Sequence, residues 1–262
     1  MGRKIVYSPL KKDEQGVWRM DYEDMDKKIK ENHIHLAIFC SPHNPSGRVW
    51  EREEIEAAME VYRKNDCIVI SDEIWSDLTL GNRQHIPTQT VSEDAKNRTI
   101  ALYAPSKTFN LAGLQTAAVY AENSILHHRM WRQLNTDEVA EPNAFAIQAT
   151  IAAFQYGEEW LDELREYVEK NKQYVTEFLQ EKIPLIHPVA GDATYLMWLD
   201  CRALGLDNDA LRRFMIEQAG LGLNDGCSFG RSLNGFMRLN AACPRATLEQ
   251  AMRQLEAAVN SL

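Results

Sequence analysis

The sequence is poor in basic residues and has no long apolar run. Its 262 residues carry 29 lysines and arginines against 38 aspartates and glutamates, a formal net charge of −9 at pH 7. A nucleic-acid-binding domain usually carries a basic patch or a strongly basic composition, so this balance argues against a nucleic-acid partner. Apolar stretches such as residues 34–40 fall far short of the roughly 20 residues that cross a bilayer. The first residues also lack the apolar region of a secretory signal. We therefore expect no membrane partner and a cytoplasmic location.

Patterns that bind structural metals or form disulfide frameworks are also missing. The five cysteines form no CxxC pair and are odd in number; they are Cys40, Cys67, Cys201, Cys227 and Cys243. This spacing predicts neither a zinc site nor a set of disulfides. The histidine pairs at 33 and 35 and at 127 and 128 have no clear third ligand in the sequence. We therefore expect no metal.

What is present is typical of a packed globular protein. The apolar fraction is 45% and the charged fraction 26%, and the length suits one large or two small domains. In the first half, strand-like segments at 33–40, 67–70 and 99–103 alternate with a helical pattern whose apolar positions are 55, 58, 59 and 62. This order predicts a parallel α/β sheet, and we expect the strand at 33–40 to be buried.

The pattern changes in the second half. A helical stretch over 144–179 ends before Pro184 and Pro188, after which strand-like segments at 194–199 and 235–240 alternate with helical segments at 210–219 and 247–259. We predict two domains, a large α/β domain over residues 1–159 and a smaller α+β domain over residues 160–262.

Three polar residues follow the ends of the three predicted strands. Asn44 lies in an Asn-Pro-Ser-Gly turn, Asp72 follows the second strand, and Lys107 follows the third. Ligands of open α/β sheets bind outside these strand ends. Taken singly, each residue also has an ordinary explanation: a turn for Asn44, a helix N-cap for Asp72, and an exposed loop lysine for Lys107.

Together, an amide, a carboxylate and a lysine at one sheet edge suit pyridoxal phosphate. The lysine binds the cofactor through a Schiff base, the carboxylate keeps the pyridine nitrogen protonated, and the amide hydrogen-bonds the phenolic oxygen. Arg238 lies inside the predicted strand at 235–240. An arginine there is uncommon unless it pairs with a carboxylate, and a structural salt bridge is its ordinary explanation.

Five segments of the sequence carry a family resemblance. They are SPHNPSGRVW (41–50), SDEIWSDL (71–78), APSKTFNLAGLQ (104–115), TYLMWLD (194–200) and FMRLNAACPR (236–245). The chain resembles the fold-type I pyridoxal-phosphate enzymes, in the branch of cystathionine β-lyase-like C–S lyases within the class I/II aminotransferases. The resemblance covers essentially the whole chain and implies an α/β fold. That fold has an incomplete large domain with a mostly parallel sheet, lacking the family's N-terminal segment, and a smaller C-terminal α+β domain.

The resemblance also implies a cofactor and residue roles. The cofactor is pyridoxal 5'-phosphate, with Lys107 as its catalytic Schiff-base lysine, Asp72 as the partner of the pyridine nitrogen, and Asn44 as the contact to the phenolic oxygen. Arg238 binds the substrate α-carboxylate.

The implied reaction is β-elimination from L-cystathionine or a related cysteine S-conjugate, which yields a thiol, pyruvate and ammonia. Aminotransferases usually carry an arginine where this sequence has Gln115, which favours the lyase branch. Two alternatives stay open at this point: a class I/II aminotransferase, and an inactive fragment with a structural or interaction role. A homodimer is implied if the missing N-terminal segment is supplied.

Overall fold

A computed structural model of the protein describes residues 2–230 and 232–262. The chain divides into two compact units. The first unit consists of the residues up to 43 together with 48–79 and 83–162, and the second of 44–47, 80–82 and 163–262. The domain boundary predicted between residues 159 and 160 stays a prediction.

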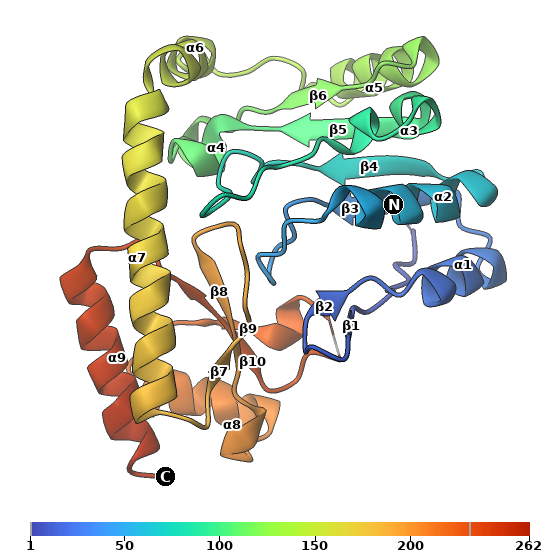
Figure 1. Ribbon diagram of the computed structural model, residues 1–262. Coiled ribbons are helices and arrows are strands. Elements are labelled where there is room, and N and C mark those ends of the chain that lie inside the picture. The colour runs from blue at the N-terminus through green and yellow to red at the C-terminus, as the bar shows by residue number, and fades with distance from the viewer. Residues whose placement is uncertain (1, 231) are drawn as a thin grey trace. The chain divides into compact units, whose positions relative to one another are not determined.

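The first unit contains a four-stranded sheet in the order β3-β4-β5-β6. Its strands are β3 (Leu36–Cys40), β4 (Ile68–Asp72), β5 (Thr99–Tyr103) and β6 (Ala118–Tyr120). The first three run parallel, whereas β6 is antiparallel to β5. In Figure 1 the arrows of β4 and β5 point toward α4 (Pro105–Thr108), and that of β6 points the opposite way. The register sets Cys40 beside Asp72 and Asp72 beside Leu102, so these three strands end at the same sheet edge.

Helices complete the first unit. They are α1 (Tyr22–Glu31), α2 (Arg52–Lys64), α3 (Glu93–Arg98), α4, α5 (Ser124–Thr136) and α6 (Ala146–Tyr156), and a short ribbon of β1 (Lys11–Lys12) and β2 (Trp18–Arg19) precedes them. The predicted apolar stripe of α2 is confirmed, because Ile55, Ala58 and Met59 are buried in one cluster with Phe39 and Val69 of the sheet. This packing of α2 on the sheet fixes β3 and β4, the second of which ends in a candidate site residue.

The expectation that the strand at 33–40 is buried is wrong. Regular pairing begins at Leu36, and the side chain of Ile38 is 76% exposed. Among the described residues β3 pairs only with β4, so it is an edge strand whose one face packs on the α2 cluster while the other remains open. An apolar run alone does not distinguish a central strand from an edge strand.

A second group of apolar side chains is exposed along and beside α6. Its members are Phe145, Ile147, Ile151, Phe154, Tyr156 and Trp160. Large exposed apolar side chains grouped in one stretch of chain favour an interaction site.

The second unit contains an antiparallel sheet in the order β7-β8-β10-β9. Its strands are β7 (His187–Pro188), β8 (Leu196–Asp200), β9 (Asn224–Asp225) and β10 (Phe236–Asn240). The helices are α7 (Glu158–Lys182), which starts in the first unit, then α8 (Asn208–Arg213), continued by a π-helical turn at Phe214–Gln218, and α9 (Arg245–Val259).

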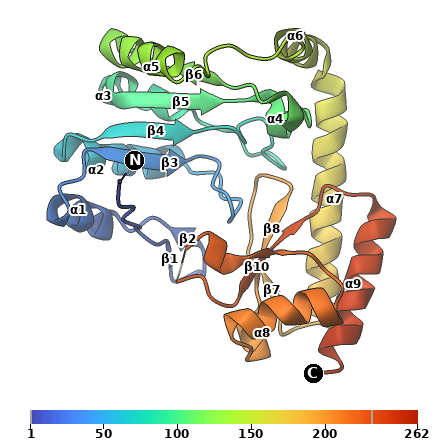
Figure 2. The same cartoon turned by 180° about the vertical axis from the view of Figure 1, so that it is seen from behind.

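The core of the second unit lies between these helices and the sheet. Val175 and Leu179 of α7, Met237 of β10 and Met252 of α9 belong to one buried cluster, and Figure 2 shows α7 and α9 running side by side. Across the described residues of both units, no helix is long and apolar enough to span a membrane.

Candidate active site

Asp72 is the last residue of β4 and lies at the sheet edge where three parallel strands end. No helix begins after it: one carboxylate oxygen accepts a hydrogen bond from the backbone N–H of Ile74 at 3.2 Å, inside a turn. The alternative of a helix N-cap is therefore wrong. The second carboxylate oxygen receives no hydrogen bond from the described residues, so it is free to bind a ligand.

Lys107 lies on α4, the short helix that follows β5. Its side chain is partly buried, and no described residue forms a hydrogen bond or ion pair with its amine. The next residue, Thr108, is fully buried and donates its hydroxyl hydrogen to Asp77 at 2.9 Å. Because Asp77 belongs to the segment that follows Asp72, this bond ties the lysine-bearing helix to the loop of the carboxylate.

Aromatic packing holds the other side of α4. The ring of Phe109 lies 5.2 Å from that of Phe154 in an edge-to-face contact and 6.0 Å from that of Trp160. Gly157, between α6 and α7, leaves the space for this ring: a Cβ there would lie 2.5 Å from Phe109 Cε1 and would also collide with the carbonyl oxygen of Ala153. The packing of Phe109 thus depends on a residue without a side chain.

We expect Gly157→Ala to displace Phe109 and to lower the free energy of unfolding by about 1–3 kcal/mol, the usual cost of overpacking. Urea denaturation followed by tryptophan fluorescence measures it, with Gly113→Ala as the matched control. A Cβ on Gly113 meets nothing within 4 Å, so that variant should unfold like the parent. Equal stability of the two variants would contradict the predicted clash.

Asn44 and Arg238 lie together in the second unit. Nη1 of Arg238 donates to Asn44 Oδ1 and Nη2 donates to Asn224 Oδ1, both at 2.9 Å. The guanidinium carbon lies 4.6 Å from the ring centre of Phe229. Burial lowers the pKa of Arg238 below its ordinary value, and Nε has no hydrogen-bond partner among the described residues.

The partners of Arg238 exclude the structural salt bridge. Among the described residues no carboxylate pairs with Arg238, whose partners are two neutral amides and an aromatic face. Arg202 in the same unit also lies over an aromatic ring, that of Phe236, but binds Asp200 through two nitrogens at 2.8 and 2.6 Å. A partly buried guanidinium without a counter-ion is suited to binding an anionic ligand.

The segment that carries Asn44 is held by a hydrogen bond to the loop before β8, and Lys172 of α7 binds that loop in turn. Gly47 has a φ of +72°, and its carbonyl accepts from the backbone N–H of Ala193 at 2.9 Å. Lys172 of α7 donates to the carbonyl oxygens of Gly191 and Ala193, both at 3.1 Å. Burial lowers the pKa of Lys172 to about 8, against weaker opposing effects of Asp192 and Glu169.

This pKa predicts a pH-dependent stability. Between about pH 8 and the ordinary lysine pKa of 10.5, the unfolded chain binds a proton at Lys172 that the folded chain has lost. The free energy of unfolding should therefore rise with pH in this window, by up to about 1.4 kcal/mol per pH unit, and Lys172→Met should lack this contribution. Urea denaturation at several pH values from 7.5 to 10.5 measures it. The control is Lys170→Met, which removes an exposed lysine paired with Glu166 on the same helix; parallel profiles for both variants would refute the assignment.

The structure thus brings the predicted residues together in pairs. Asp72 and Lys107 share one sheet edge in the first unit, and Asn44 and Arg238 are hydrogen-bonded in the second. Sequence reasoning missed Asn224 and Phe229, which hold Arg238, and the Thr108–Asp77 bond. No local pattern marks Asn224 or Phe229: Asn224 faces Arg238 through the pairing of β9 with β10, and Phe229 follows the 3₁₀ turn Gly226–Ser228 after β9.

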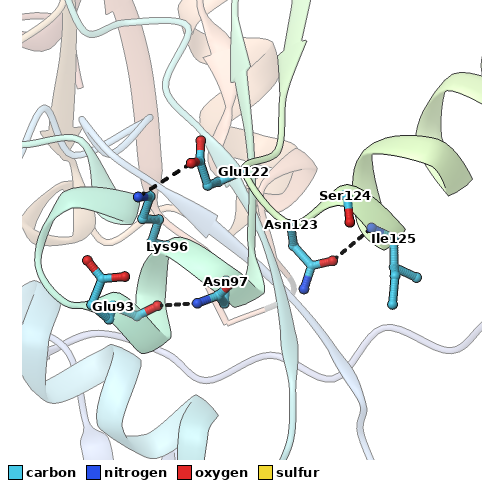
Figure 3. Close-up of a pocket in the computed structure, with 7 residues that line it drawn as sticks. All are labelled: Glu93, Lys96, Asn97, Glu122, Asn123, Ser124 and Ile125. Atoms are coloured by element: carbon cyan, nitrogen blue, oxygen red, sulfur yellow. Dashed lines mark hydrogen bonds and ion pairs between the residues drawn. The ribbon is translucent and has the colours of Figure 1, made fainter.

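A surface pocket of the first unit does not include Asp72 or Lys107 among its lining residues. Figure 3 shows its lining residues: Glu93, Lys96, Asn97, Glu122, Asn123, Ser124 and Ile125. They belong to α3, to the start of α5 and to the end that β6 reaches as it runs antiparallel to β5. This pocket is therefore at the opposite sheet end from Lys107, and its side chains are already engaged with one another through the Lys96–Glu122 ion pair and the Asn123 cap of α5.

Each unit by itself offers groups of the kinds that pyridoxal phosphate requires. Lys107 offers an unpaired amine and Asp72 a carboxylate oxygen. Asn44 uses its amide oxygen for Arg238, and its amide nitrogen makes no hydrogen bond to a described residue, so it can donate to the phenolic oxygen of the cofactor. Asp72 and Lys107 at the carboxyl ends of parallel strands agree with the resemblance to fold-type I pyridoxal-phosphate enzymes that the sequence motifs carry.

Comparison with known proteins agrees with the family resemblance of the sequence motifs. Residues 1–255 match the family model for aminotransferase class I and II, and the chain belongs to this family. It is 38% identical over 259 residues to cystathionine beta-lyase PatB of Bacillus subtilis, covering 99% of this chain and 67% of that protein.

Solved structures give the same result. Cystalysin of Treponema denticola, whose crystal structure contains a pyridoxal 5'-phosphate cofactor, superimposes with a TM-score of 0.95 at 30% identity, covering 99% of this chain and 66% of cystalysin. A PLP-bound putative aminotransferase from Clostridium difficile 630 gives a TM-score of 0.94 at 37% identity, covering 98% and 66%. The predicted fold and the predicted C–S lyase-like resemblance are confirmed, and the chain spans about two thirds of the length of these relatives.

Proposed function

We propose that this protein is a pyridoxal-phosphate-dependent C–S β-lyase of the cystathionine β-lyase type. Its substrate is L-cystathionine or a related cysteine S-conjugate, and its products are a thiol, pyruvate and ammonia. The observation that carries the proposal is Arg238, a partly buried arginine whose described partners are Asn44, Asn224 and Phe229 rather than a carboxylate. Similarity to cystathionine beta-lyase PatB favours elimination over transamination.

The cofactor supplies an electron sink that weakens the bonds at the substrate Cα. Lys107 would hold it through Nζ, and its amine would serve as the general base for the Cα proton of the substrate. Asp72 would hold the pyridine nitrogen and favour its protonated form, because a carboxylate stabilises a neighbouring positive charge. The Thr108–Asp77 bond holds the Lys107 helix to the loop after Asp72.

Arg238 binds the α-carboxylate of the substrate. Its planar fork suits two parallel hydrogen bonds to a carboxylate, and Asn44, Asn224 and Phe229 fix the plane of that fork. Fixing the carboxylate orients the Cα–H bond for proton removal, and good orientation of this kind lowers the barrier. Asn44 therefore serves two roles, through its oxygen to Arg238 and through its nitrogen to the cofactor.

The test is an assay for pyruvate from L-cystathionine with pyridoxal phosphate, run with and without an added 2-oxo acid. The proposal expects pyruvate and a free thiol in both cases. Conversion of the added 2-oxo acid to its amino acid, without pyruvate or free thiol, would support the aminotransferase alternative. Absence of both products, with no visible cofactor absorbance, would support the alternative of an inactive fragment.

We also propose that the protein acts as a homodimer in the cytoplasm. The exposed apolar side chains along α6 support an interface with a further copy. The five cysteines are all free thiols, which suits a reducing compartment. Analytical ultracentrifugation of the purified chain tests the dimer, and a single monomeric species at micromolar concentration would rule it out.

A further inference from the structure

A buried carboxylate follows Asp72 directly in the chain. Glu73 is 0% exposed, and its two oxygens accept four hydrogen bonds. Oε1 accepts from the hydroxyl of Ser71 and from the backbone N–H of Thr88, both at 2.9 Å. Oε2 accepts from His85 Nε2 at 2.8 Å and from the hydroxyl of Tyr103 at 2.7 Å. Burying a carboxylate is costly unless hydrogen bonds compensate for the lost water, and here all its acceptor positions are used.

The donors to Glu73 come from three different parts of the first unit. Ser71 is on β4, His85 and Thr88 belong to the segment leading into the 3₁₀ turn at Thr88–Thr90, and Tyr103 is the last residue of β5. Gln89 extends the network by donating to the Tyr103 hydroxyl at 2.8 Å. The carboxylate therefore joins the end of β4, the end of β5 and the segment that packs beside them.

Glu73 and two of its donors, Ser71 and Tyr103, lie close in sequence to the proposed cofactor residues. Asp72 lies between Ser71 and Glu73, and Tyr103 precedes Lys107 by four residues. Because side chains alternate along a strand, Ser71 and Glu73 share one face and Asp72 points to the other. The backbone N–H of Glu73 also donates to the carbonyl of Leu102 at 3.0 Å, so β4 and β5 stay paired up to the site.

We propose that Glu73 is a positioning residue that fixes Asp72 relative to the lysine-bearing end of β5, acting through its hydrogen bonds to Ser71, His85, Thr88 and Tyr103. This inference rests on the proposed function, because Asp72 and Lys107 must be held in register only if a cofactor bridges them. Glu73 itself stays ionised: burial acts to raise its pKa, but the hydrogen bonds from His85 and Tyr103 outweigh burial and lower the pKa below its ordinary value.

Glu73→Gln should disturb the hydrogen-bond network while keeping the size of the side chain at position 73 nearly the same. The amide oxygen can still accept, but the amide nitrogen carries hydrogens and would face donors such as the Tyr103 hydroxyl or the Thr88 N–H. A buried donor left without an acceptor is costly, so the strand end should shift. We expect the dissociation constant for pyridoxal phosphate to rise about 10-fold.

A double-mutant cycle with Asp72→Asn separates positioning from general destabilisation. If Glu73 acts through Asp72, then Glu73→Gln should weaken cofactor affinity in the parent but change it by less than about 2-fold in the Asp72→Asn background. Its effect on the Tm of the cofactor-free protein should be the same in both backgrounds, because the network is lost in both. Affinity is read from the lysine-dependent visible absorbance, and Tm from calorimetry.

Two further variants complete the design. Tyr103→Phe removes one of the four hydrogen bonds and keeps the ring, so it repeats the cycle with a milder change, about 3-fold in affinity, if Glu73→Gln does not fold. Glu122→Gln is the matched control, because Glu122 accepts from the Tyr120 hydroxyl at 2.5 Å on β6 but lies at the other end of the sheet. It should leave affinity unchanged.

The outcomes distinguish the inference from the function. Additive losses of affinity for Glu73→Gln and Asp72→Asn, or a lower Tm with unchanged affinity, would overturn the positioning role while the proposed function stands. If the parent shows no Lys107-dependent absorbance, the proposed function fails, and the positioning role falls with it.

Discussion

Replacement of Lys107 by alanine is expected to abolish the visible absorbance of bound pyridoxal phosphate and to lower pyruvate release by at least about 10³-fold, since the variant loses both the Schiff-base amine and the general base. The amine of Lys107 has no partner among the described residues and lies on a helix fixed by Thr108 and Phe109. Its loss should therefore leave the fold intact. The measurement is a cofactor titration followed by absorbance, with a pyruvate assay on the same samples.

Two control variants test whether these losses are specific to the amine of Lys107. Lys96→Ala removes an exposed lysine that pairs with Glu122 at the other end of the sheet, and it should bind cofactor and release pyruvate like the parent. Lys107→Arg keeps the positive charge, but a guanidinium does not give up its proton near neutral pH and so cannot form the Schiff base. A variant at Lys107 that kept both the absorbance and the turnover would show that another residue holds the cofactor.

Replacement of Arg238 by lysine is expected to raise KM for L-cystathionine about 10- to 100-fold, which corresponds to the loss of about 1.5–3 kcal/mol from a charge-assisted bidentate contact. An ammonium cannot reproduce the planar fork that Asn44 and Asn224 hold at 2.9 Å. Affinity for the cofactor should change less, since the lysine and the carboxylate of the first unit remain. Steady-state kinetics together with a cofactor titration measures the two effects separately.

Arg202→Lys is the matched control for this prediction. Arg202 also lies over an aromatic ring of the second unit, but its charge is already neutralised by Asp200 at 2.6 Å. Its substitution should lower stability slightly and leave KM unchanged. If Arg202→Lys raised KM as much as Arg238→Lys, the arginine without a counter-ion would not be the carboxylate site.

The surroundings of Arg238 give a physical reason why this side chain suits a carboxylate ligand. A carboxylate side chain beside Arg238 would compete with the substrate for the same two nitrogens. Asn44 and Asn224 instead accept one hydrogen bond each and leave the positive charge uncompensated. Burial of this charge lowers the pKa of Arg238, and an anionic ligand would offset that cost by restoring a counter-charge.

Several features of the site could be predicted from local sequence alone. Asp72 and Lys107 each follow an apolar strand, and parallel strands end at one edge of a sheet, so their proximity follows from the strand–helix–strand order. The register of β4 with β5 sets Asp72 beside Leu102, so the two strands end together, while the proximity of Asp72 and Lys107 stays a prediction. The same reasoning failed for the burial of β3, where Ile38 is exposed, because the identity of a strand's neighbours is not encoded within the strand itself.

The sequence by itself determined the alternating strands and helices of the first half, the residues at the three strand ends, and the family motifs, because periodicity, turns and catalytic residue types are local properties. Only the tertiary structure decided the partners of Arg238, the exclusion of an N-cap at Asp72, and the four-fold hydrogen bonding of Glu73. The partners of Arg238 and three of the four donors to Glu73 lie far from them in the chain, whereas the bond from Ile74 to Asp72 is local and shows only that no helix starts there. Hydrogen bonds and burial act over a few ångströms in space, so sequence neighbours alone do not specify them.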